Sequence, residues 1–287
     1  MKSLIESVLG TKIVSGLNND RTPNNSVLTT DTGETYFLKT GPPGFFFYCE
    51  AEGLKEIESC KEINTPPVIA VSDNFILTRY ILKGEVTPQF FCNMGRSLAR
   101  MHKHYATEYG FRSNNYIGTN PQINIARENE KHSWSEFFFN NRILFQYMMA
   151  EKKGLLSQPF IERFRKAENN INNILEEVAE APSLLHGDLW SGNYICGINN
   201  SPYLIDCAVY YGHRETDLAM TKIFGGFSAD FYRCYNNEFP LQPGWQKRER
   251  IYKLYHILNH LNIFGNSYMN EAENLINYYI CESNYFL

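Results

Sequence analysis

One segment in the second half of the chain constrains the fold more than any other feature. It reads His186-Gly187-Asp188-Leu189-Trp190-Ser191-Gly192-Asn193, and the pattern of a β-hairpin follows it. Tyr194 to Ile198 reads as a strand, Asn199-Asn200 as a two-residue turn that tolerates positive φ, and Ser201 to Asp206 as the returning strand. A turn centred on Asn199-Asn200 sets Asn193 directly across from Asp206, unless Pro202 shifts the register because proline cannot donate to the ladder. The sequence therefore predicts that two side-chain oxygen donors meet at one end of a hairpin.

These two side chains have the chemistry of a magnesium site. Mg²⁺ takes hard oxygen donors and is usually held by one or two carboxylates together with substrate phosphates. Asp188 precedes Asn193 by five residues, which is the layout of a kinase catalytic loop in which the Asp orients a hydroxyl and accepts its proton. We therefore expect Asp188 to be the catalytic base, and Asn193 and Asp206 to hold the metal ion of a bound nucleotide. Taken alone, the loop motif could occur in any surface loop, and Asp206 could simply end a turn.

A lysine at the end of an upstream strand is a candidate ligand of the nucleotide phosphates. The run 35–38 is rich in β formers and leads to Lys39, after which two prolines and two glycines force a turn. A helix follows, and its expected buried stripe is Glu50, Gly53, Leu54 and Ile57. A carboxylate on an apolar stripe is costly unless it is paired, so the pattern predicts an ion pair between Glu50 and Lys39. The alternative for Lys39 taken alone is a surface lysine at a strand end.

Together these parts resemble the fructosamine kinase (ketosamine kinase) family, whose relatives are the aminoglycoside phosphotransferases within the protein-kinase-like fold. The runs HGDLWSGN at 186–193 and YYGHRETDLAMT at 210–221 carry most of the resemblance. Further support comes from FGGF at 224–227, YHILNHLN at 255–262, and NYIG at 115–118 with Pro121-Gln122. HGDxxxxN marks the wider superfamily, whereas HGDLWSGN joined to YYGHRETDLAM is typical of the fructosamine kinases.

The resemblance implies an α+β, bilobal protein-kinase-like fold. Residues 1–82 would form a small β-rich N-lobe, a nucleotide-binding sheet with one helix. Residues 83–287 would form a larger, mostly helical C-lobe with the catalytic loop and the metal-binding hairpin. The resemblance also implies that ATP and Mg²⁺ are the cofactors, and that the γ-phosphoryl group passes to the C3 hydroxyl of a fructosamine or ribulosamine. The product can then eliminate and release the free amine, which is deglycation repair.

The same resemblance assigns roles to individual residues. The catalytic base falls on Asp188, and the metal ligands fall on Asn193 and Asp206. The phosphate-binding lysine and its helix partner fall on Lys39 and Glu50. The hinge whose backbone holds adenine matches 75–81, and its candidate contacts are Arg79, Tyr80 and Ile81. Residues that support the loop or face the substrate are His186, Trp190, His213, Arg214, Glu215 and Asp217.

The chain departs from the family pattern at two places on the nucleotide side. Arg79 stands where the family usually has an acidic residue, which a backbone hinge should tolerate. The phosphate loop, 14–20, keeps Ser15-Gly16 but lacks further glycines, and Pro23-Asn24-Asn25 follows where the family has a strand. The resemblance therefore makes the fold a firmer expectation than the affinity for ATP.

Several of these residues also admit an ordinary structural interpretation. His186 is expected to brace the catalytic loop through hydrogen bonds rather than to act as a base. Trp190 is either a core aromatic or a platform for the sugar ring, and Asp217 either caps a helix N-terminus or holds the loop. His256 and His260 have the four-residue spacing of zinc ligands, but the Glu that a metalloprotease needs is missing, which favours packing near the substrate cleft or lining it.

Hydrophobic periodicity indicates helices in most of the second part of the chain. Apolar residues recur at helical spacing over 91–105 and again over 160–178, and we interpret both stripes as core. His102 is expected on the surface or in packing. After Gly84, everything except the catalytic hairpin region is expected to be helical.

Composition favours a cytoplasmic enzyme. The net charge is −4 over 287 residues, with no basic block to bind nucleic acid and no Lys-rich amphipathic run to bind a membrane surface. Glu6 interrupts the only apolar stretch at the N-terminus, which argues against a signal peptide, and no apolar run reaches membrane-spanning length. The 7 cysteines form no CxxC pair, so reduced core thiols are expected.

Two rival functions stay open at this level. A kinase for aminoglycosides or another small hydroxylated amine would share Asp188, Asn193 and Asp206, but it should show an acidic substrate wall. Only Glu271, Glu273 and Glu282 enrich the last helices. A nucleotide-binding pseudokinase is the other rival: the poor glycine loop favours it, and the intact triad argues against it. The expected partner is a small ketosamine or a glycated lysine of a protein, with no nucleic acid and no membrane.

Overall fold

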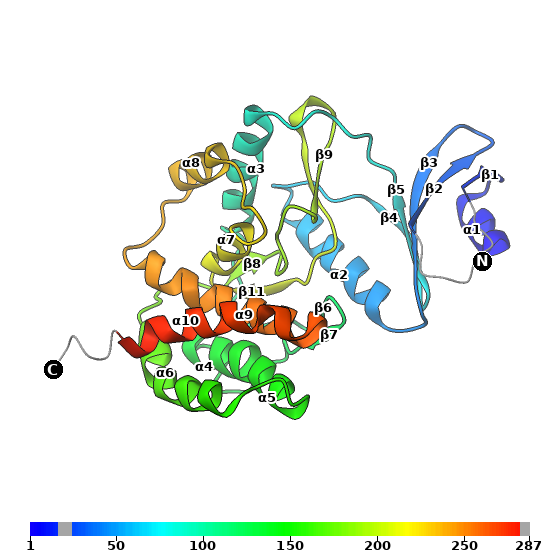
Figure 1. The fold of residues 1–287 in the computed structure, drawn as a ribbon. Helices are drawn as coiled ribbons and strands as arrows, with labels where there is room; N and C mark the ends of the chain where they lie inside the picture. The colour runs from blue at the N-terminus through cyan, green and yellow to red at the C-terminus, as the bar shows by residue number, and fades with distance from the viewer. Residues whose placement is uncertain (17–24, 282–287) are drawn as a thin grey trace.

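The computed structural model, which describes residues 1–16 and 25–281, has two lobes (Figure 1). The N-lobe contains α1 (Lys2–Leu9), β1 (Ile13–Ser15), β2 (Asn25–Thr30), β3 (Thr35–Thr40), α2 (Phe46–Ser59), β4 (Val68–Ser72) and β5 (Phe75–Arg79). The C-lobe begins with α3 (Pro88–Met101), β6 (Asn115–Ile117), β7 (Asn120–Gln122), α4 (Trp134–Phe138), η1 (Phe139–Leu144), α5 (Phe145–Lys152) and α6 (Gln158–Glu176). It continues with β8 (Ser183–Leu185), β9 (Tyr194–Cys196), η2 (Ile198–Asn200), β10 (Pro202–Leu204), β11 (Tyr210–Gly212), α7 (Glu215–Thr221), α8 (Ala229–Glu238), α9 (Trp245–Phe264), η3 (Asn266–Tyr268) and α10 (Met269–Cys281). The expected bilobal, protein-kinase-like class is confirmed.

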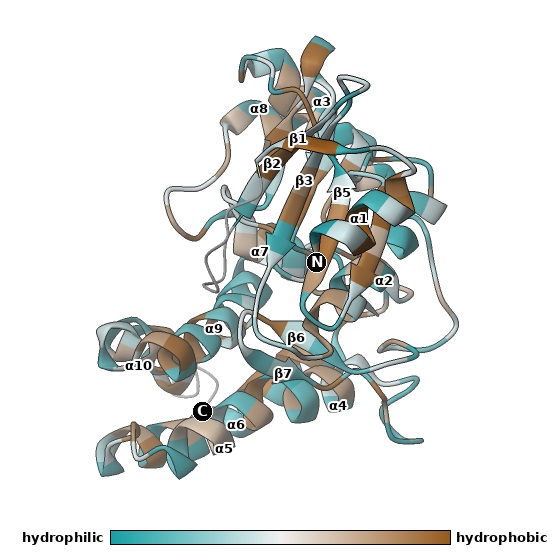
Figure 2. Cartoon of the chain, turned by 90° about the vertical axis from the view of Figure 1, so that its right-hand side faces the viewer, coloured by the Kyte–Doolittle hydropathy of each residue, from teal (hydrophilic) through white to brown (hydrophobic). Residues whose placement is uncertain are grey.

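The N-lobe is an antiparallel sheet with a helix on each face. Its strand order is β1-β2-β3-β5-β4. Because side chains alternate along a strand, Tyr36 and Leu38 on β3 enter a core with Ile5 of α1, whereas Phe37 and Lys39 face the other way. Figure 2 looks onto the first face, with α1 in front of the sheet, and α2 packs behind it. The alternation thus turns Lys39 toward α2 and the C-lobe.

Helix α1 was not among the expected elements, since the N-lobe was predicted to hold a single helix. Glu6 interrupts its apolar pattern, but the carboxylate has a structural use: it accepts the backbone N–H of Ile13 at 2.8 Å, where β1 begins. Gly10 ends the helix with φ 66°, a left-handed conformation that glycine adopts without strain. Only Ile5 of α1 is buried. The helix is therefore held by buried Ile5, by the bond from Ile13 to Glu6 and by its C-terminal cap at Gly10.

The catalytic hairpin forms, but its register differs by one residue from the prediction. Cys196 pairs with Pro202 and Tyr194 with Leu204, so Asn193 lies opposite Ile205, whose N–H donates to the Asn193 carbonyl at 3.1 Å. The cause is the turn: Asn199 and Asn200 both have left-handed φ, 59° and 57°, inside the three-residue η2. The loop is one residue longer than a two-residue turn, which shifts the pairing by one.

The C-lobe is built around α9, which is mostly buried from Ile251 to Asn262. The predicted stripes are core where they are helical, as with Met94 and Leu98 on α3 and Phe164 on α6, but Tyr105 lies beyond α3 and is exposed. The expectation of helix everywhere outside the hairpin was wrong, because β6 pairs with β7 and β8 with β11. These strands have three residues each, too few to show a period. Over the described residues, no helix is both long and apolar enough to cross a membrane.

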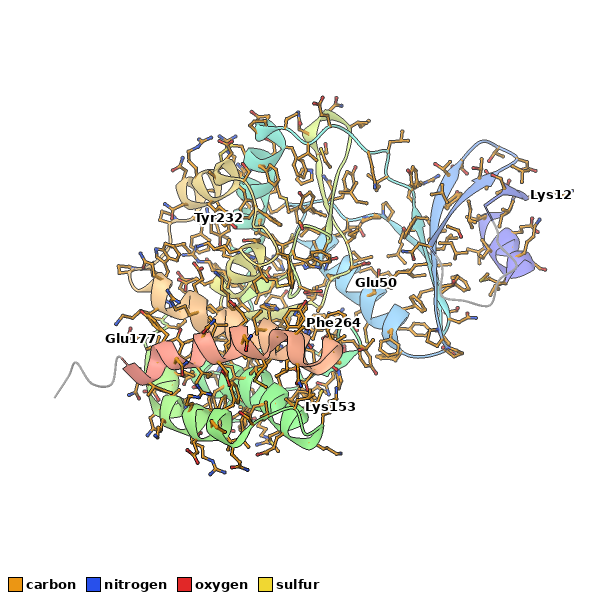
Figure 3. All side chains as sticks on the ribbon, viewed as in Figure 1. Lys12, Glu50, Lys153, Glu177, Tyr232 and Phe264 are labelled. Atoms are coloured by element: carbon orange, nitrogen blue, oxygen red, sulfur yellow. A yellow bond between two sulfur atoms is a disulfide. The ribbon has the colours of Figure 1, made fainter. Side chains whose placement is uncertain are left out.

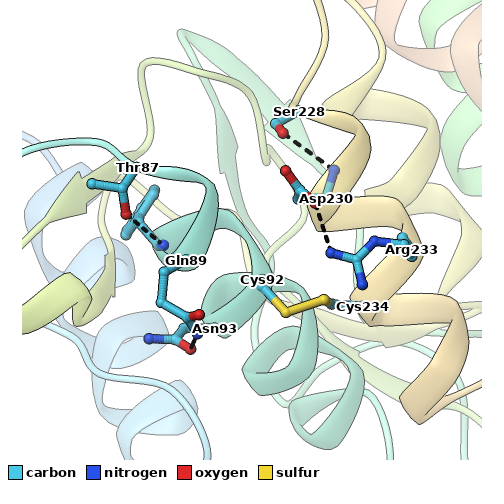
Figure 4. Close-up of a disulfide and its surroundings, with 9 residues drawn as sticks. Thr87, Gln89, Cys92, Asn93, Ser228, Asp230, Arg233 and Cys234 are labelled. Atoms are coloured by element: carbon cyan, nitrogen blue, oxygen red, sulfur yellow. Dashed lines mark hydrogen bonds and ion pairs between the residues drawn. A yellow bond between two sulfur atoms is a disulfide. The ribbon is translucent and has the colours of Figure 1, made fainter.

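The expectation of reduced thiols was wrong for two cysteines. Cys92 on α3 and Cys234 on α8 form a disulfide, with their Cα atoms 5.2 Å apart (Figure 4). Gly95 lets the two helices approach, since a Cβ at that position would lie 2.3 Å from the carbonyl oxygen of Phe231. The two cysteines are 142 residues apart in sequence, so no local pattern could pair them. Cys49, Cys60, Cys196 and Cys207 are free thiols.

The disulfide predicts a redox-dependent stability. Replacing both partners, Cys92→Ser with Cys234→Ser, should lower the free energy of unfolding by about 2–4 kcal/mol, because the unfolded chain loses a crosslink across a long loop. The measurement is thermal unfolding with and without dithiothreitol. The reductant should lower the midpoint of the wild-type protein and leave that of the double variant unchanged. A wild-type midpoint that does not respond to reductant would contradict the bond.

Candidate active site

A cavity of about 420 Å³ lies between the sheet and the catalytic hairpin. Its lining includes every residue predicted to bind ATP and one predicted metal ligand: Lys39, Glu50, Arg79, Tyr80, Ile81 and Asp206. Val27, Phe37, Leu54 and Ile76 give it an apolar side from the N-lobe, and Tyr194 and Ile195 come from β9. Figure 3 shows Glu50 on α2, between the sheet and the C-lobe. An apolar slot with charged groups at one end fits a base linked to phosphates.

Lys39 joins the two lobes through two ion pairs. Its Nζ lies 2.9 Å from Glu50 Oε2 and 2.8 Å from Asp206 Oδ1. Burial disfavours the charged lysine, but the two carboxylates outweigh it and raise the pKa of Lys39. Burial raises the pKa of Glu50, although Lys39 opposes the shift. The ion pair expected from the helix stripe is present, and Asp206 joins it as a second partner that the sequence did not indicate.

The three residues of the predicted triad meet beside this cavity, and Asp206 is the one that lines it. The amide nitrogen of Asn193 donates to the backbone carbonyl of Asp188 at 2.8 Å and to its carboxylate at 3.2 Å, and it lies 3.5 Å from the carbonyl of Asp206. The register differs from the prediction, yet the residues converge, because Asp206 takes a left-handed φ of 53° that turns the chain just after the hairpin. Burial raises the pKa of Asp188 to about 7, although the hydrogen bond from Asn193 lowers it in part.

Gly187 and His186, the two residues that precede Asp188, give the catalytic loop its shape. Gly187 has φ 84°, and a Cβ there would lie 2.0 Å from the carbonyl oxygen of Ala208, so only glycine fits. His186 is fully buried; its Nε2 donates to the Ile205 carbonyl at 2.9 Å and its Nδ1 accepts the N–H of Asp188 at 3.2 Å. Burial lowers the pKa of His186, which suits this neutral form. His186 therefore braces the loop, as expected, and does not face the cavity.

Asp217 on α7 anchors the same loop. Its carboxylate accepts the backbone N–H of His186 at 2.7 Å and that of Gly187 at 2.9 Å. Burial would raise its pKa, but hydrogen bonds and nearby histidines, His102 first, hold the pKa of Asp217 below its ordinary value. The structure thus favours the loop-holding interpretation of Asp217 over that of a helix cap.

Sequence reasoning missed the partner of Asp217. His102 Nε2 donates to Asp217 at 3.2 Å, and His102 Nδ1 lies 2.8 Å from the Tyr235 hydroxyl. Because a carboxylate only accepts, the neutral ring must carry its proton on Nε2, and burial lowers its pKa accordingly. His102 is fully buried, so it is not a surface residue. Nothing beside it in the sequence signals this bond, since its partners lie more than a hundred residues away.

The β6–β7 hairpin supports the chain just after Asp206, a role that the motif alone did not reveal. Asn115 donates to the carbonyl of Val209 at 2.8 Å, and Gln122 donates to that of Ala208 at 2.9 Å. Gln122 also donates to the side chain of Asn115 at 2.8 Å. Because these amides are buried and bonded to each other, the backbone that carries Asp206 has a rigid support.

Three candidates from the 210–221 motif do not face the substrate. Arg214 is fully buried and makes a bidentate pair with Glu180 at 2.7 and 2.8 Å. His213 bonds the Tyr252 hydroxyl at 2.7 Å, and Glu215 pairs with Arg248 at 2.7 Å. Each has protein partners inside the C-lobe, so their role is to support the segment between β11 and α7.

Trp190 is half-buried and borders the catalytic loop. Its indole covers Gly192, where a Cβ would lie 2.4 Å from the ring, and its edge meets Phe224 with ring centroids 5.9 Å apart. A position at the rim of the loop suits a platform for an acceptor better than a core aromatic.

Part of the predicted nucleotide-binding region lies outside the described residues. These are residues 17–20 of the predicted phosphate loop, 14–20, and the following residues 21–24, while Asn25 begins β2. In the hinge, Arg79 pairs with Glu34 at 2.8 Å, and the N–H groups of Arg79 and Tyr80 bond the carbonyls of Pro67 and Thr35. Ile81 is the remaining candidate for a backbone contact to adenine.

Comparison with known proteins agrees with this geometry. The family model described as fructosamine kinase matches residues 17–282. A probable ketoamine kinase of Enterococcus faecium is 35% identical over 245 residues, 84% of this chain and 86% of the relative. A chloroplastic protein-ribulosamine 3-kinase of Oryza sativa subsp. indica is 35% identical over 269 residues, 88% of this chain and 74% of the relative. The crystal structure of a putative fructosamine-3-kinase from Thermobifida fusca superposes with a TM-score of 0.87 at 26% identity, covering 98% of each chain.

The ion pairs of Lys39 predict a measurable coupling. Lys39→Ala should weaken ATP binding and destabilise the protein by less than the roughly 3–5 kcal/mol of a fully buried pair, because the Lys39 and Glu50 side chains keep 28% and 15% exposure. The double variant with Glu50→Gln should recover part of the stability and none of the activity. Chemical denaturation of the four proteins gives the cycle. Additive changes would mean that the two side chains do not interact.

Proposed function

The chain belongs to the fructosamine kinase family, and we propose that it uses the residues above to transfer the γ-phosphoryl group of ATP to the C3 hydroxyl of a ketosamine. The observation that carries the proposal is that Asp188, Asn193, Asp206 and Lys39 lie next to one another, with Lys39 and Asp206 on the wall of the cavity. They supply the base, the oxygen donors and the cation that phosphoryl transfer needs.

In this proposal ATP lies in the cavity between the lobes. Adenine contacts the backbone of Ile81, and Lys39 binds the phosphates. Because a glycine-poor phosphate loop offers few donors, phosphate binding depends strongly on Lys39, which Glu50 keeps in place at 2.9 Å.

Asn193 and Asp206 fit Mg²⁺ by their chemistry. The carboxylate of Asp206 keeps 45% of its side chain exposed toward the cavity, and the amide oxygen of Asn193 remains available because its nitrogen takes the bonds to Asp188. Oxygen donors of this kind suit Mg²⁺, which neutralises phosphate charge. Lys39 balances the Asp206 carboxylate at 2.8 Å and must share it with the metal.

Asp188 acts on the acceptor. Its carboxylate orients the C3 hydroxyl and accepts the proton as the hydroxyl oxygen attacks the γ-phosphorus, and ADP leaves. Burial brings the pKa of Asp188 to about 7, so the base is matched to neutral pH. Phosphate on C3, beside the C2 carbonyl, is then a good leaving group, and its elimination lets the amine be released. We propose fructosamines or ribulosamines as acceptors, free or on a protein lysine, in the cytoplasm.

The rival functions have less support. An aminoglycoside kinase needs an acidic substrate wall, but Glu273 on α10 already pairs with Arg163 at 2.9 Å, and Glu282 lies outside the described residues. A pseudokinase would not require a base, a metal pair and a phosphate lysine in one place.

The first test compares wild-type protein with Asp188→Asn on a panel of fructosamines, ribulosamines and aminoglycosides, following ADP release. The wild type should phosphorylate the ketosamines, and the variant should lose about 10²–10⁴ in rate. ATP affinity, measured by calorimetry, should be unchanged, because Asp188 serves the hydroxyl. Equal losses of turnover and ATP affinity would remove Asp188 from this role, and turnover of aminoglycosides alone would reject the ketosamine.

A second test concerns the metal. Bound Mg-ATP stabilises a protein by RT ln(1 + [L]/Kd), so it should raise the melting temperature of the wild type. Asp206→Ala should lose the Mg²⁺-dependent part of that increase. Glu271→Ala, on α10, is a matched control that should keep it. An undiminished shift in Asp206→Ala would show that the carboxylate does not hold the metal.

A further inference from the structure

The segment between α7 and α8 has an unusual backbone. Phe224, Gly225 and Gly226 follow one another with φ of 56°, 94° and 73°, all left-handed. Glycine adopts this conformation freely, but a bulky side chain does so only under strain. Backbone strain of this kind persists where the surroundings hold it, and it gathers at functional sites.

Both ends of this segment are anchored. Lys222 forms an ion pair with Glu249, and its Nζ lies 4.3 Å from the ring centroid of Trp245. At the other end, the N–H of Phe227 donates to the Tyr232 hydroxyl at 3.4 Å.

Gly225, in the middle of the segment, is not closely packed. A Cβ at Gly225 would meet no described atom within 4 Å. Close packing at the glycines therefore does not impose the left-handed path. The left-handed backbone instead sets the position of the Phe224 ring.

That ring stands beside the catalytic loop. Its centroid lies 5.9 Å from that of Trp190, two residues after Asp188, and 5.0 Å from that of His260 on α9. The Phe224 side chain nevertheless remains 42% exposed. A large apolar ring in a strained conformation, exposed beside Trp190 of the catalytic loop, is available for contact with an acceptor.

His260 adds a polar group to this cluster. Its Nδ1 lies 2.7 Å from the carbonyl of His256, and a carbonyl only accepts, so Nδ1 carries the proton. Burial lowers the pKa of His260, which keeps the ring neutral and leaves Nε2 with a lone pair. Over the described residues Nε2 has no hydrogen-bond partner within the chain.

We infer that Phe224 is a specificity-determining residue, which forms with Trp190 and His260 the wall that binds the ketosamine beside Asp188. The inference rests on the proposed function. Aromatic faces bind the C–H face of a sugar and attract a single ammonium by cation–π contact, and His260 Nε2 accepts from a substrate hydroxyl or ammonium. None of these three side chains bears a carboxylate, so the wall suits a monoamine adduct rather than a polycationic aminoglycoside.

The test removes the ring and keeps the backbone. Asn tolerates the left-handed region, so Phe224→Asn should raise the KM for free fructosyl-lysine about tenfold or more while changing kcat by less than about threefold. The KM for ATP should stay at its wild-type value, and the melting temperature should not fall, because Asn relieves backbone strain at this position. Phe224→Tyr, which keeps a ring, should restore the KM for fructosyl-lysine.

Phe45→Asn is the matched control. Phe45 is 53% exposed, and the ring contact it makes is with Tyr48, so the same substitution there should leave both KM values unchanged. A wild-type KM for fructosyl-lysine in Phe224→Asn overturns the inference, as does a parallel rise in the KM for ATP. Wild-type protein that phosphorylates only ribulosyl-lysine calls for the same comparison with that substrate. Wild-type protein that phosphorylates neither adduct rejects the proposed function, and this inference with it.

Discussion

The active site depends on the hydrogen bonds that the buried carboxylate of Asp217 accepts. The carboxylate accepts two backbone N–H groups of the catalytic loop, from His186 and Gly187, and a third hydrogen bond from His102. A buried charge is tolerated only where such donors satisfy it. These bonds hold the loop between β8 and the hairpin in one position, and that position of the loop sets the position of Asp188. The Tyr235 hydroxyl orients His102 from α8, so the C-lobe helices fix the loop from behind.

The ion pairs of Lys39 impose a second constraint, between the lobes. One ammonium lies between Glu50 from the N-lobe and Asp206 from the C-lobe. The three charges sum to a net negative charge, which the divalent cation of the proposed mechanism would offset if it binds at Asp206 with the phosphates. The ion pairs of Lys39 thus link the two lobes at the proposed metal site.

The acceptor side is built differently from the nucleotide side. Trp190, Phe224 and His260 come from the catalytic loop, the segment after α7, and α9, and rings rather than charges bring them together. α7 connects the two sides: Asp217 near its start holds the loop, and the segment after its end carries Phe224. Any shift of α7 would therefore change the position of the base and of the acceptor wall together.

The sequence by itself determined which reactive side chains make up the candidate site. Asp188, Asn193 and Asp206 lie close together in the sequence, and their spacing alone indicates phosphoryl-transfer chemistry. The apolar stripe that contains Glu50 required a cation as a partner, and Lys39 at the end of the preceding strand supplies it. Hydrophobic periodicity also indicated the long helices, since a period shows only over several turns. Tertiary structure decided what depends on partners far apart in the chain. The hairpin register followed from two left-handed asparagines, the bond from His102 to Asp217 joins α3 to α7, and the disulfide depends on the close approach that Gly95 permits. Such contacts follow from how the helices and loops pack in space, and short-range patterns do not record that packing.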